Sequence, residues 1–330
     1  MQYRNLGGSG LKVSEISLGS WISCHDSNNM DIPRQIIEKA LSCGINFFDT
    51  SNAYHKGNAE EILGTVLSEH PRDSYVIATK VYFPQGEAPN LRGLSRKHIF
   101  AEVEKSLKRL RTDHIDLYYC HWYDKETPIE ETLRAMDDLV KKGAVLYYGV
   151  SNWTAAQIAY GLRVIDRYGL YKITANQPSY NMLDRYIENE SIPLCVREGI
   201  GQVVYSPLAQ GALTGKYRRS AAYPEGSRAV NPLYTAEVTI FDYLTDEMLE
   251  TIENLNKIAV SAGLALADMA IAWTLRLPAV SSALIGASKP EQVVQNANAS
   301  DIKLSSDILD EIDKVLSESR HSVKHNIISW

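Results

Sequence analysis

Short runs of β-branched and aromatic residues alternate along this chain with longer segments in which apolar residues recur every three or four positions. Eight of the short runs have the length and composition of strands: Ile16–Leu18, Asn46–Asp49, Tyr75–Thr79, Ile115–Cys120, Val145–Val150, Ile173–Asn176, Gln202–Tyr205 and Ser282–Ile285. Strands that alternate with helices predict an α/β fold, a (β/α)8 TIM barrel, because right-handed crossovers place every helix outside one parallel sheet. A doubly wound open sheet is the alternative, although no G-x-G-x-x-G motif follows the first strand.

Capping residues mark the ends of two predicted helices. Thr127 supplies a hydroxyl N-cap, Pro128 the first helical residue and Glu130 the acid of a capping box, and Gly143 ends this helix. Ser95 caps the helix before the fourth strand. Each of these helices is followed directly by the next predicted strand.

The length of 330 residues fits a barrel with three additions. A barrel alone takes about 250 residues. The remainder predicts an N-terminal hairpin, a long connection from Ser206 to about Leu244 after the seventh strand, and an extra C-terminal helix near Asp307–Leu316. Length alone leaves one or two domains open, but no linker interrupts the pattern, which predicts a single domain over residues 1–330.

Composition and charge exclude several classes of protein. The chain is 45% hydrophobic and 22% charged, as ordinary globular proteins are, and its net charge of −6 gives nucleic acid no bulk electrostatic attraction. No run approaches the ~18 apolar residues of a membrane span, and the N-terminus lacks a signal-peptide core, so we expect no membrane insertion and a cytoplasmic location. The cysteines contain no C-x-x-C pair and the histidines have no ligand spacing, so we expect no metal site.

Four polar residues stand at the ends of consecutive predicted strands. Asp49 ends the second strand with Tyr54 shortly after it, Lys80 ends the third, and His121 ends the fourth. Any one of them alone is better explained by a loop hydrogen bond, but the carboxyl ends of barrel strands form one mouth, where all four would meet. A phenol with a pKa of about 10 needs a nearby cation to exchange a proton near neutral pH. We therefore expect Lys80 to serve Tyr54, Asp49 to hold Lys80, and His121 to orient a substrate oxygen.

These motifs resemble those of the aldo-keto reductase superfamily. The likeness is carried by the run Gly44–Thr50, by Asp49 with Tyr54, by Thr79–Lys80 and by Cys120–His121. Further segments are similar to the branch that contains the β subunits of voltage-gated potassium channels and their bacterial enzyme relatives: Arg4–Gly7, Ser9–Leu11, Arg92–Ile99, Thr127–Pro128, Glu130–Thr132, Ser206–Ala209 and Leu284–Ser288. The likeness covers nearly the whole chain.

The resemblance implies the (β/α)8 barrel and the NADPH-dependent reduction of small aldehydes and ketones. Hydride would pass from the nicotinamide to the carbonyl carbon, Tyr54 would protonate the oxygen, and Asp49, Lys80 and His121 would complete a tetrad. The channel β subunits carry asparagine where this chain has His121, which favours catalysis here. The alternative is a nicotinamide-dependent redox-sensing binding subunit with little turnover. Several members of the branch form tetramers or larger rings, so a homo-oligomer is also implied.

The same resemblance implies a cofactor that lies extended across the barrel mouth. The matching positions are Ser20, Trp21, Asp49, Ser151, Asn152, Gln177, Tyr205, Ser206, Leu208, Gln210, Gly211, Lys216, Ser227, Arg228, Gly286, Ser288, Gln292, Gln295 and Asn296. Tyr205 would stack on the nicotinamide, and Lys216 with Arg228 would suit a diphosphate. Many family members pair an arginine at the Gln292 position with the 2′-phosphate of NADPH. The channel-subunit branch has glutamine there and still binds NADPH, so NADPH is favoured over NADH.

The substrate pocket is expected to have aromatic walls around one polar corner. The residues predicted to form it are Trp21, Tyr54, Tyr82, Phe83, His121 and Trp122. Such a pocket suits a small aldehyde, and a sugar-derived aldehyde, methylglyoxal, an aromatic aldehyde and a ketosteroid all stay open as substrates. The tail from His325 to Trp330 either covers the mouth, as tails do in relatives, or is disordered.

Overall fold

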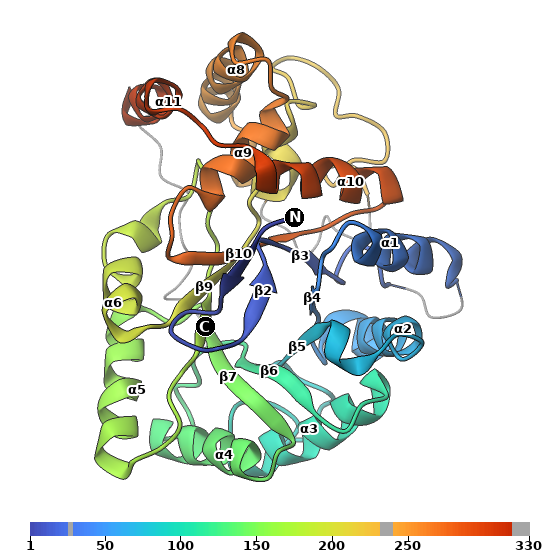
Figure 1. The fold of residues 1–330 in the computed structure, drawn as a ribbon, viewed down its shortest axis with the longest axis vertical. Helices are drawn as coiled ribbons and strands as arrows, with labels where there is room; N and C mark the ends of the chain where they lie inside the picture. The colour runs from blue at the N-terminus through green and yellow to red at the C-terminus, as the bar shows by residue number, and fades with distance from the viewer. Residues whose placement is uncertain (26–28, 232–239, 319–330) are drawn as a thin grey trace.

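Eight parallel strands close into a barrel in the computed structural model of this chain, which describes residues 1–25, 29–231 and 240–318. The strand order is β10-β3-β4-β5-β6-β7-β8-β9, and β9 pairs back with β10 to complete the circle. Figure 1 looks down this barrel and shows the helices arranged around it. The predicted (β/α)8 TIM barrel is confirmed, and the open-sheet alternative is wrong.

The barrel strands overlap all eight predicted runs. They are β3 (Ile16–Gly19), β4 (Phe47–Asp49), β5 (Val76–Val81), β6 (Ile115–Cys120), β7 (Val145–Ser151), β8 (Ala175–Gln177), β9 (Gly201–Tyr205) and β10 (Val280–Ile285). The prediction stopped β5 at Thr79, whereas Lys80 and Val81 also pair with β6. A lysine marks a strand end only when its charge reaches water, and here the ammonium is paired inside the barrel.

Helices follow the strands on the outside of the barrel. The helices between successive strands and after β10 are α1 (Asp31–Ser42), α2 (Asn58–Leu67), α3 (Arg96–Leu110), α4 (Ile129–Lys141), α5 (Ala155–Tyr168), α6 (Ser191–Glu198), α9 (Leu266–Leu275) and α10 (Pro290–Asn298). Among the described residues, two more helices lie outside this ring, α8 (Asp246–Ser261) and α11 (Ser306–Glu318), and they pack against each other. The extra C-terminal helix is thus confirmed as α11, while α8 has no counterpart in the sequence prediction.

The predicted helix caps agree with the structure at one helix and differ at the other. Ser95 caps α3 by accepting a hydrogen bond from the backbone N–H of His98. The capping box predicted for α4 is wrong, because Pro128 occupies the N-cap position and no side chain caps the helix. The Thr127 hydroxyl instead donates to the Asp124 carboxylate at 2.7 Å. The helix begins one residue later than predicted, at Ile129, so the Thr127 oxygen is not at the N-cap position where it would accept from the first turn.

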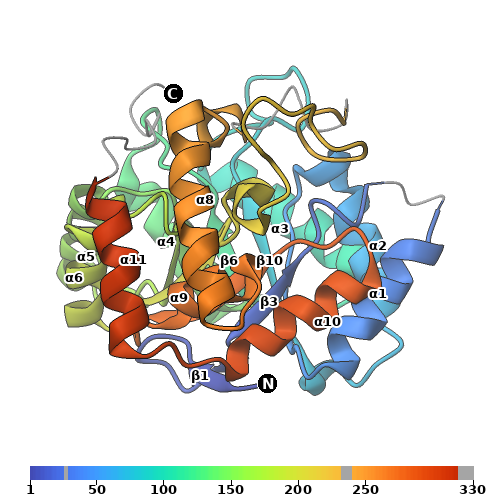
Figure 2. The same ribbon diagram turned by 90° about the horizontal axis from the view of Figure 1, so that it is seen from above.

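The N-terminal hairpin closes one end of the barrel. Its strands are β1 (Tyr3–Asn5) and β2 (Lys12–Ser14), which pair antiparallel. Leu6 and Val13 pack on the apolar cluster inside the barrel, whose other buried members are Phe47, Val76, Ala78, Leu117, Tyr119, Ala175 and Val203. In Figure 1 the hairpin lies across the barrel, and Figure 2 shows it at the end opposite the long connection. The carboxyl ends of the strands therefore form the open mouth.

The long connection after β9 lies over this mouth. It contains the short 3-10 helices η4 (Ala209–Thr214) and η5 (Ile240–Tyr243) before α8 begins. Other 3-10 turns are η1 (Tyr54–Gly57), η2 (Arg72–Ser74), η3 (Tyr186–Glu188) and η6 (Ala299–Asp301). Residues 232–239 of the predicted connection and the tail from His325 to Trp330 lie outside the described residues. Among the described residues no single helix has the length and hydropathy to cross a membrane; α8 and α9 meet both criteria only as a pair bent by 91°.

A glycine allows α2 to contact α3 closely, and this contact predicts a stability difference. A Cβ added at Gly64 would lie 2.4 Å from the Arg109 carbonyl oxygen, so the two backbones would have to separate. Gly64→Ala should lower the free energy of unfolding by about 1–3 kcal/mol, the usual cost of overpacking. Gly10→Ala is the matched control, because nothing lies within 4 Å of the Cβ it would add. Urea unfolding midpoints measure both, and equal midpoints would contradict the close contact.

Candidate active site

The structure brings the four predicted catalytic side chains together at the mouth. Asp49 ends β4, Tyr54 begins η1, Lys80 lies in β5 and His121 directly follows β6. Lys80 Nζ donates to an Asp49 carboxylate oxygen, to the Thr50 carbonyl oxygen at 2.8 Å and to the Tyr54 hydroxyl at 3.2 Å. The Asp49 and Lys80 side chains are completely buried. This buried ammonium has three acceptors for its three protons, which is the condition for keeping a charge away from water.

The Lys80 ammonium remains charged at neutral pH. Burial alone would lower its pKa, but Asp49 and Tyr54 outweigh burial and raise the pKa above its ordinary value. Burial raises the pKa of the Asp49 carboxyl, against which Lys80 and Gln177 act as hydrogen-bond donors. These contacts favour the ionised pair, in which a charged Lys80 ammonium faces an Asp49 carboxylate.

The Tyr54 phenol differs in one respect from the expectation based on sequence. Lys80 does lower its pKa, as expected, but burial has the larger effect and the pKa is raised above the ordinary value. Tyr54 is therefore a phenol that carries its proton throughout the neutral range, hydrogen-bonded to a cation. Such a group donates a proton to a strongly basic oxygen, and the neighbouring ammonium stabilises the phenolate left behind.

The His121 imidazole is neutral. Burial, helped by the Lys80 charge, lowers its pKa well below the ordinary value. The ring meets Tyr54 edge to face at 5.9 Å and Phe83 edge to face at 4.8 Å between centroids. His121 can therefore accept or donate a hydrogen bond at the mouth without bringing a second positive charge next to Lys80.

The turn that carries Tyr54 has a strained backbone. His55 and Lys56 adopt φ values of 49° and 57°, and Gly57 follows at 92°. Consecutive left-handed residues other than glycine are held only when the surroundings compensate for their strain. The His55 ring bonds the Trp21 carbonyl oxygen at 2.7 Å across the mouth. Sequence reasoning missed this turn, because neither His55 nor Lys56 is a residue type that marks it.

Buried charges on the outer helices support the same turn from behind. The amide of Asn52 donates to the Glu102 carboxylate of α3 at 2.9 Å. Glu60 of α2 accepts from Thr79, the residue before Lys80, at 2.5 Å and from Arg109 of α3 at 2.6 Å. Glu60 and Glu102 are fully buried. Two helices thus hold both the Tyr54 turn and the strand of Lys80.

A second set of hydrogen bonds connects the catalytic group to the end of β7 and β8. Gln177 Nε2 donates to Asp49 at 2.7 Å, and the Ser151 hydroxyl donates to the Gln177 carbonyl oxygen at 2.8 Å. The Tyr205 hydroxyl donates to Asn152 Oδ1 at 2.8 Å. These amide groups lie beside the tetrad, and they belong to residues that the resemblance implied for the cofactor.

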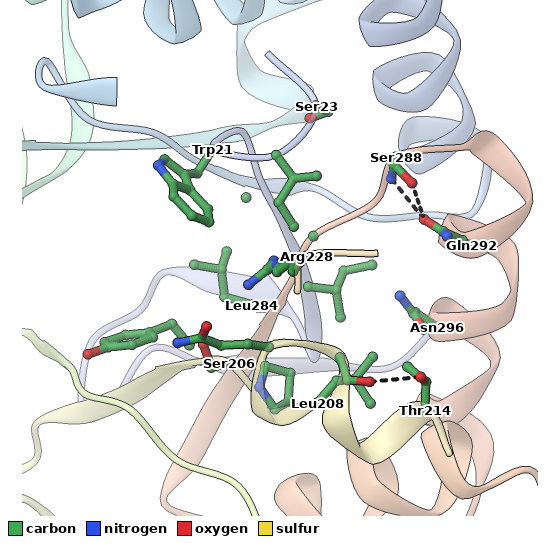
Figure 3. A pocket seen from close by; sticks show the side chains of 18 of the residues that line it. Trp21, Ser23, Ser206, Leu208, Thr214, Arg228, Leu284, Ser288, Gln292 and Asn296 are labelled. Carbon is green, nitrogen blue, oxygen red and sulfur yellow. Dashed lines mark hydrogen bonds between the residues drawn. The ribbon is translucent and has the colours of Figure 1, made fainter. Parts of the chain in front are cut away.

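A cleft of about 910 Å³ opens from the tetrad across the mouth. The predicted residues that line it are Trp21, Tyr54, Phe83, His121, Trp122, Ser151, Asn152, Gln177, Tyr205, Ser206, Leu208, Gln210, Gly211, Lys216, Arg228, Gly286, Ser288, Gln292, Gln295 and Asn296. Figure 3 shows Trp21 and Ser23 on one side of the cleft, Ser206, Leu208 and Thr214 on the other, and Gln292 and Asn296 projecting from α10. The volume is at the upper end of ordinary ligand pockets.

Five predicted residues do not line the cleft but lie beside those that do. They are Ser20, Asp49, Lys80, Tyr82 and Ser227. Asp49 and Lys80 act behind Tyr54, and Tyr82 packs edge to face on Phe83 at 5.4 Å. The buried hydroxyls of Ser20 and Ser227 have no hydrogen-bond partner among the described residues.

Two cations that line the cleft, Lys216 and Arg228, suit it to an anion. The Lys216 pKa is lowered by burial and by the Arg228 charge, and no described residue that lines the cleft carries a carboxylate. The Arg228 guanidinium lies 5.4 Å from the centroid of the Trp21 ring, which places it over the cleft. At α10, Gln292 accepts from the Ser288 backbone N–H at 2.8 Å and from its hydroxyl at 3.2 Å (Figure 3).

Sequence reasoning missed several lining residues. They are Gly19, Ile22, Ser23, His25, Ile32, Pro207, Thr214, Gly226, Asn231, Ala265, Ala267, Leu284 and Ile285. Those in the loop after β3 could have been found from their place after a barrel strand. Ala265 and Ala267 have no polar side chain that would mark them in the sequence. They line the cleft at the start of α9. Among the described residues no cluster of three or more metal-ligating side chains occurs.

Comparisons with known proteins identify the family. The model of the aldo/keto reductase family matches residues 15–317. This chain belongs to the aldo/keto reductase family. A probable voltage-gated potassium channel subunit beta of Arabidopsis thaliana is 41% identical over 321 residues, covering 96% of this chain and 97% of the relative. Relatives with corresponding names are 39% identical, one from Oryza sativa subsp. japonica over 96% of this chain and 97% of its own length, and one from Schizosaccharomyces pombe over 95% and 93%.

Aldo/keto reductases generally bind NAD(P)H, and the cleft of this family member fits such a group. It runs from Tyr54 and His121 to the residues of α10, has amide groups beside the tetrad and is lined by two cations, Lys216 and Arg228. The orphan hydroxyls of Ser20 and Ser227 are further donors that a polar ligand next to them would satisfy.

The neutral state of His121 in this reductase-family fold predicts how stability depends on pH. Its pKa is lowered in the folded state, so unfolding allows a proton to bind once the pH falls below about 6.5. The free energy of unfolding should therefore decrease from pH 7 towards pH 5. The part of this slope that is due to His121 should approach about 1.4 kcal/mol per pH unit.

Urea unfolding at pH 5, 6, 7 and 8 measures this dependence. His121→Gln should reduce the slope below pH 6.5 by the His121 share, and His25→Gln, a change at an exposed histidine, is the control. A slope that is the same in the wild type and in His121→Gln would mean that His121 does not resist protonation.

Proposed function

We propose that this protein reduces small aldehydes and ketones to alcohols with NADPH and that Tyr54 is the general acid. The observation that carries the proposal is the Tyr54 phenol, which lines the cleft while its oxygen is hydrogen-bonded to the buried Lys80 ammonium. Membership of the aldo/keto reductase family supports an oxidoreductase, and the residues of the site supply the proton chemistry that a carbonyl reduction needs.

The protein residues have separate tasks in this reaction. When bound, NADPH would supply the hydride that the carbonyl carbon receives. The Tyr54 O–H bond breaks as its proton passes to the carbonyl oxygen, so the product leaves as a neutral alcohol. The negative charge then remains on the Tyr54 oxygen, 3.2 Å from Lys80 Nζ. Asp49 keeps the ammonium in place, and its own carboxylate is held by Gln177.

The remaining residues position the two reactants. Ser151, Asn152 and Gln177 offer amide and hydroxyl groups to the nicotinamide carboxamide, and the Tyr205 ring supplies a flat surface for the nicotinamide. Trp21, Phe83 and Trp122 form apolar walls that exclude water around the carbonyl carbon.

NADPH rather than NADH is the proposed cofactor because the cleft has two cations and no carboxylate among its lining residues. The Gln292 carbonyl oxygen accepts from Ser288, which leaves the neutral amide N–H groups of Gln292 to donate to a phosphate oxygen. A carboxylate that would pair with the ribose 2′-hydroxyl of NADH, as in many NADH sites, is absent from this described lining.

Removing the Tyr54 hydroxyl should abolish most of the activity. Tyr54→Phe is expected to lower kcat at least about 10²-fold, because general acid catalysis contributes roughly 10²–10⁴-fold, while the NADPH Kd stays nearly the same. Tyr82→Phe is the matched control, since Tyr82 is the neighbouring tyrosine that does not line the cleft. NADPH oxidation is followed by absorbance with a panel of small aldehydes and ketones. Turnover in Tyr54→Phe equal to that of the wild type would remove Tyr54 from the mechanism.

Lys80 and Tyr54 should behave as one unit. Lys80→Met is expected to lower kcat about as much as Tyr54→Phe, and the double variant should be little worse than either single variant, because residues that act together are non-additive. The same absorbance assay, run on all three variants with saturating NADPH, measures the coupling. If the two defects multiplied, the residues would contribute independently and the shared proton donor would be wrong.

The two cations of the cleft should determine cofactor affinity. Lys216→Gln and Arg228→Gln are each expected to raise the NADPH Kd about tenfold, the loss of one charge-assisted hydrogen bond. Arg219→Gln is the control, because that arginine pairs with Glu250 and Glu253 on the exposed surface. Fluorescence titration with NADPH and with NADH measures both affinities. Unchanged affinities in Lys216→Gln and Arg228→Gln would place the phosphates elsewhere.

A second function is supported by the names of the relatives. Three proteins that match nearly the whole chain are named as potassium channel β subunits. The alternative proposal is a redox-sensing binding subunit that holds a nicotinamide and turns over slowly. It would form a homo-oligomer and bind a partner protein. Tight NADPH binding without turnover on any carbonyl, together with a tetramer or larger ring in light scattering, would favour this function over the reductase.

A further inference from the structure

Ser51 connects the Tyr54 turn to the His121 ring. It lies between Asp49 and Tyr54 in the chain, and its side chain is completely buried. Its hydroxyl oxygen lies 3.3 Å from His121 Nδ1. Sequence reasoning gave this serine no role, and the reaction proposed above does not use it.

The ring of His121 is oriented by three neighbours. Phe83 and Tyr54 meet it edge to face, and Ser51 is the hydrogen-bond partner of Nδ1. His121 Nε2 forms no hydrogen bond with any described residue, and His121 lines the cleft. The Nε2 edge is therefore the one available to a molecule in the cleft.

A neutral imidazole carries its proton on either Nδ1 or Nε2, and the direction of the Ser51 O–H bond bears on which of the two His121 adopts. Its oxygen accepts a hydrogen bond from the Ala53 backbone N–H at 3.2 Å, so its single proton is left for another acceptor. Two acceptors are within reach of this proton: His121 Nδ1, the nearer, at 3.3 Å and Asn52 Oδ1 at 3.5 Å. If the proton points to Nδ1, that nitrogen is an acceptor and the ring proton must sit on Nε2.

We propose that Ser51 is a positioning residue that holds neutral His121 with its proton on Nε2, so that the ring donates a hydrogen bond to the carbonyl oxygen of the substrate. This inference rests on the proposed carbonyl reduction for the identity of the acceptor. The carbonyl oxygen then receives two hydrogen bonds, one from Tyr54 and one from His121. Two donors polarise the carbonyl bond and fix its orientation, whereas an Nδ1–H ring would present a lone pair to the oxygen and repel it.

The proton position can be read without turnover. Protein labelled with ¹⁵N-histidine is examined by long-range ¹H–¹⁵N NMR at pH 7, with and without NADPH, and His121→Gln identifies the His121 signals. The wild type should show a protonated Nε2 and an unprotonated Nδ1. Ser51→Ala should lose this single state and give a mixture with the Nδ1–H form, and Ser51→Thr, which keeps the hydroxyl, should restore it. Ser261→Ala is the control, because its hydroxyl donates only within α8.

Kinetics provide the second measurement. Ser51→Ala should lower kcat about three- to tenfold, the effect of one misplaced neutral hydrogen bond, with the NADPH Kd unchanged and with recovery in Ser51→Thr. The loss should be much smaller than that of Tyr54→Phe, because the proton donor itself is intact.

The results separate this inference from the proposed function. An Nδ1–H or doubly protonated His121 in the wild type, or a proton position that is the same in Ser51→Ala, would overturn the role of Ser51 even if the protein reduces aldehydes rapidly. A Ser51-dependent Nε2–H ring in a protein without turnover would support the role of Ser51 and remove the reductase assignment instead.

Discussion

The buried Lys80 ammonium is the constraint on which the mouth of this barrel depends. A charge without water is stable only where an opposite charge and enough acceptors surround it. Its acceptors are Asp49 at the end of β4, the backbone of Thr50 and the hydroxyl of Tyr54. Satisfying one cation therefore places a carboxylate, a strand end and a phenol relative to each other. The same cation adds to the effect of burial, which is the larger, in lowering the His121 pKa and keeping its ring neutral.

The rest of the barrel confines this polar group to one end. The inside of the barrel below it is filled by apolar side chains, and the hairpin with Leu6 and Val13 covers the lower opening. Arg4 holds the hairpin by bonding Glu15 and carbonyl oxygens next to β10. With the lower end sealed, the long connection and the loops after the strands are the parts that can shape a binding cleft.

The fold was predictable because its signals are local. Each strand is a short apolar run, and each helix has its own period and often its own cap, so the barrel followed from the order of elements. The four tetrad residues were predictable because each lies in the last residues of a barrel strand or in the loop that follows one. Pairwise chemistry was harder to predict. Lys80 stayed inside its strand and burial raised the Tyr54 pKa, because both outcomes depend on neighbours that are distant in sequence. The Thr127 hydroxyl bonds Asp124, three residues earlier, and α4 begins one residue later than its predicted capping box requires.

The buried carboxylates on α2 and α3 give the outer helices of this barrel a part in positioning the catalytic residues. Barrels are often described as a stable body with exchangeable loops, since catalytic residues lie on the loops and stability lies in the ring. Here Glu60 and Glu102 belong to the ring, yet they hold Thr79 and Asn52 beside the catalytic residues. The segment from Asp49 to Gly57 is thus not a module that can be transplanted or diversified alone. A transplanted segment would leave the buried carboxylates of Glu60 and Glu102 without these partners, so it would have to carry parts of both outer helices with it.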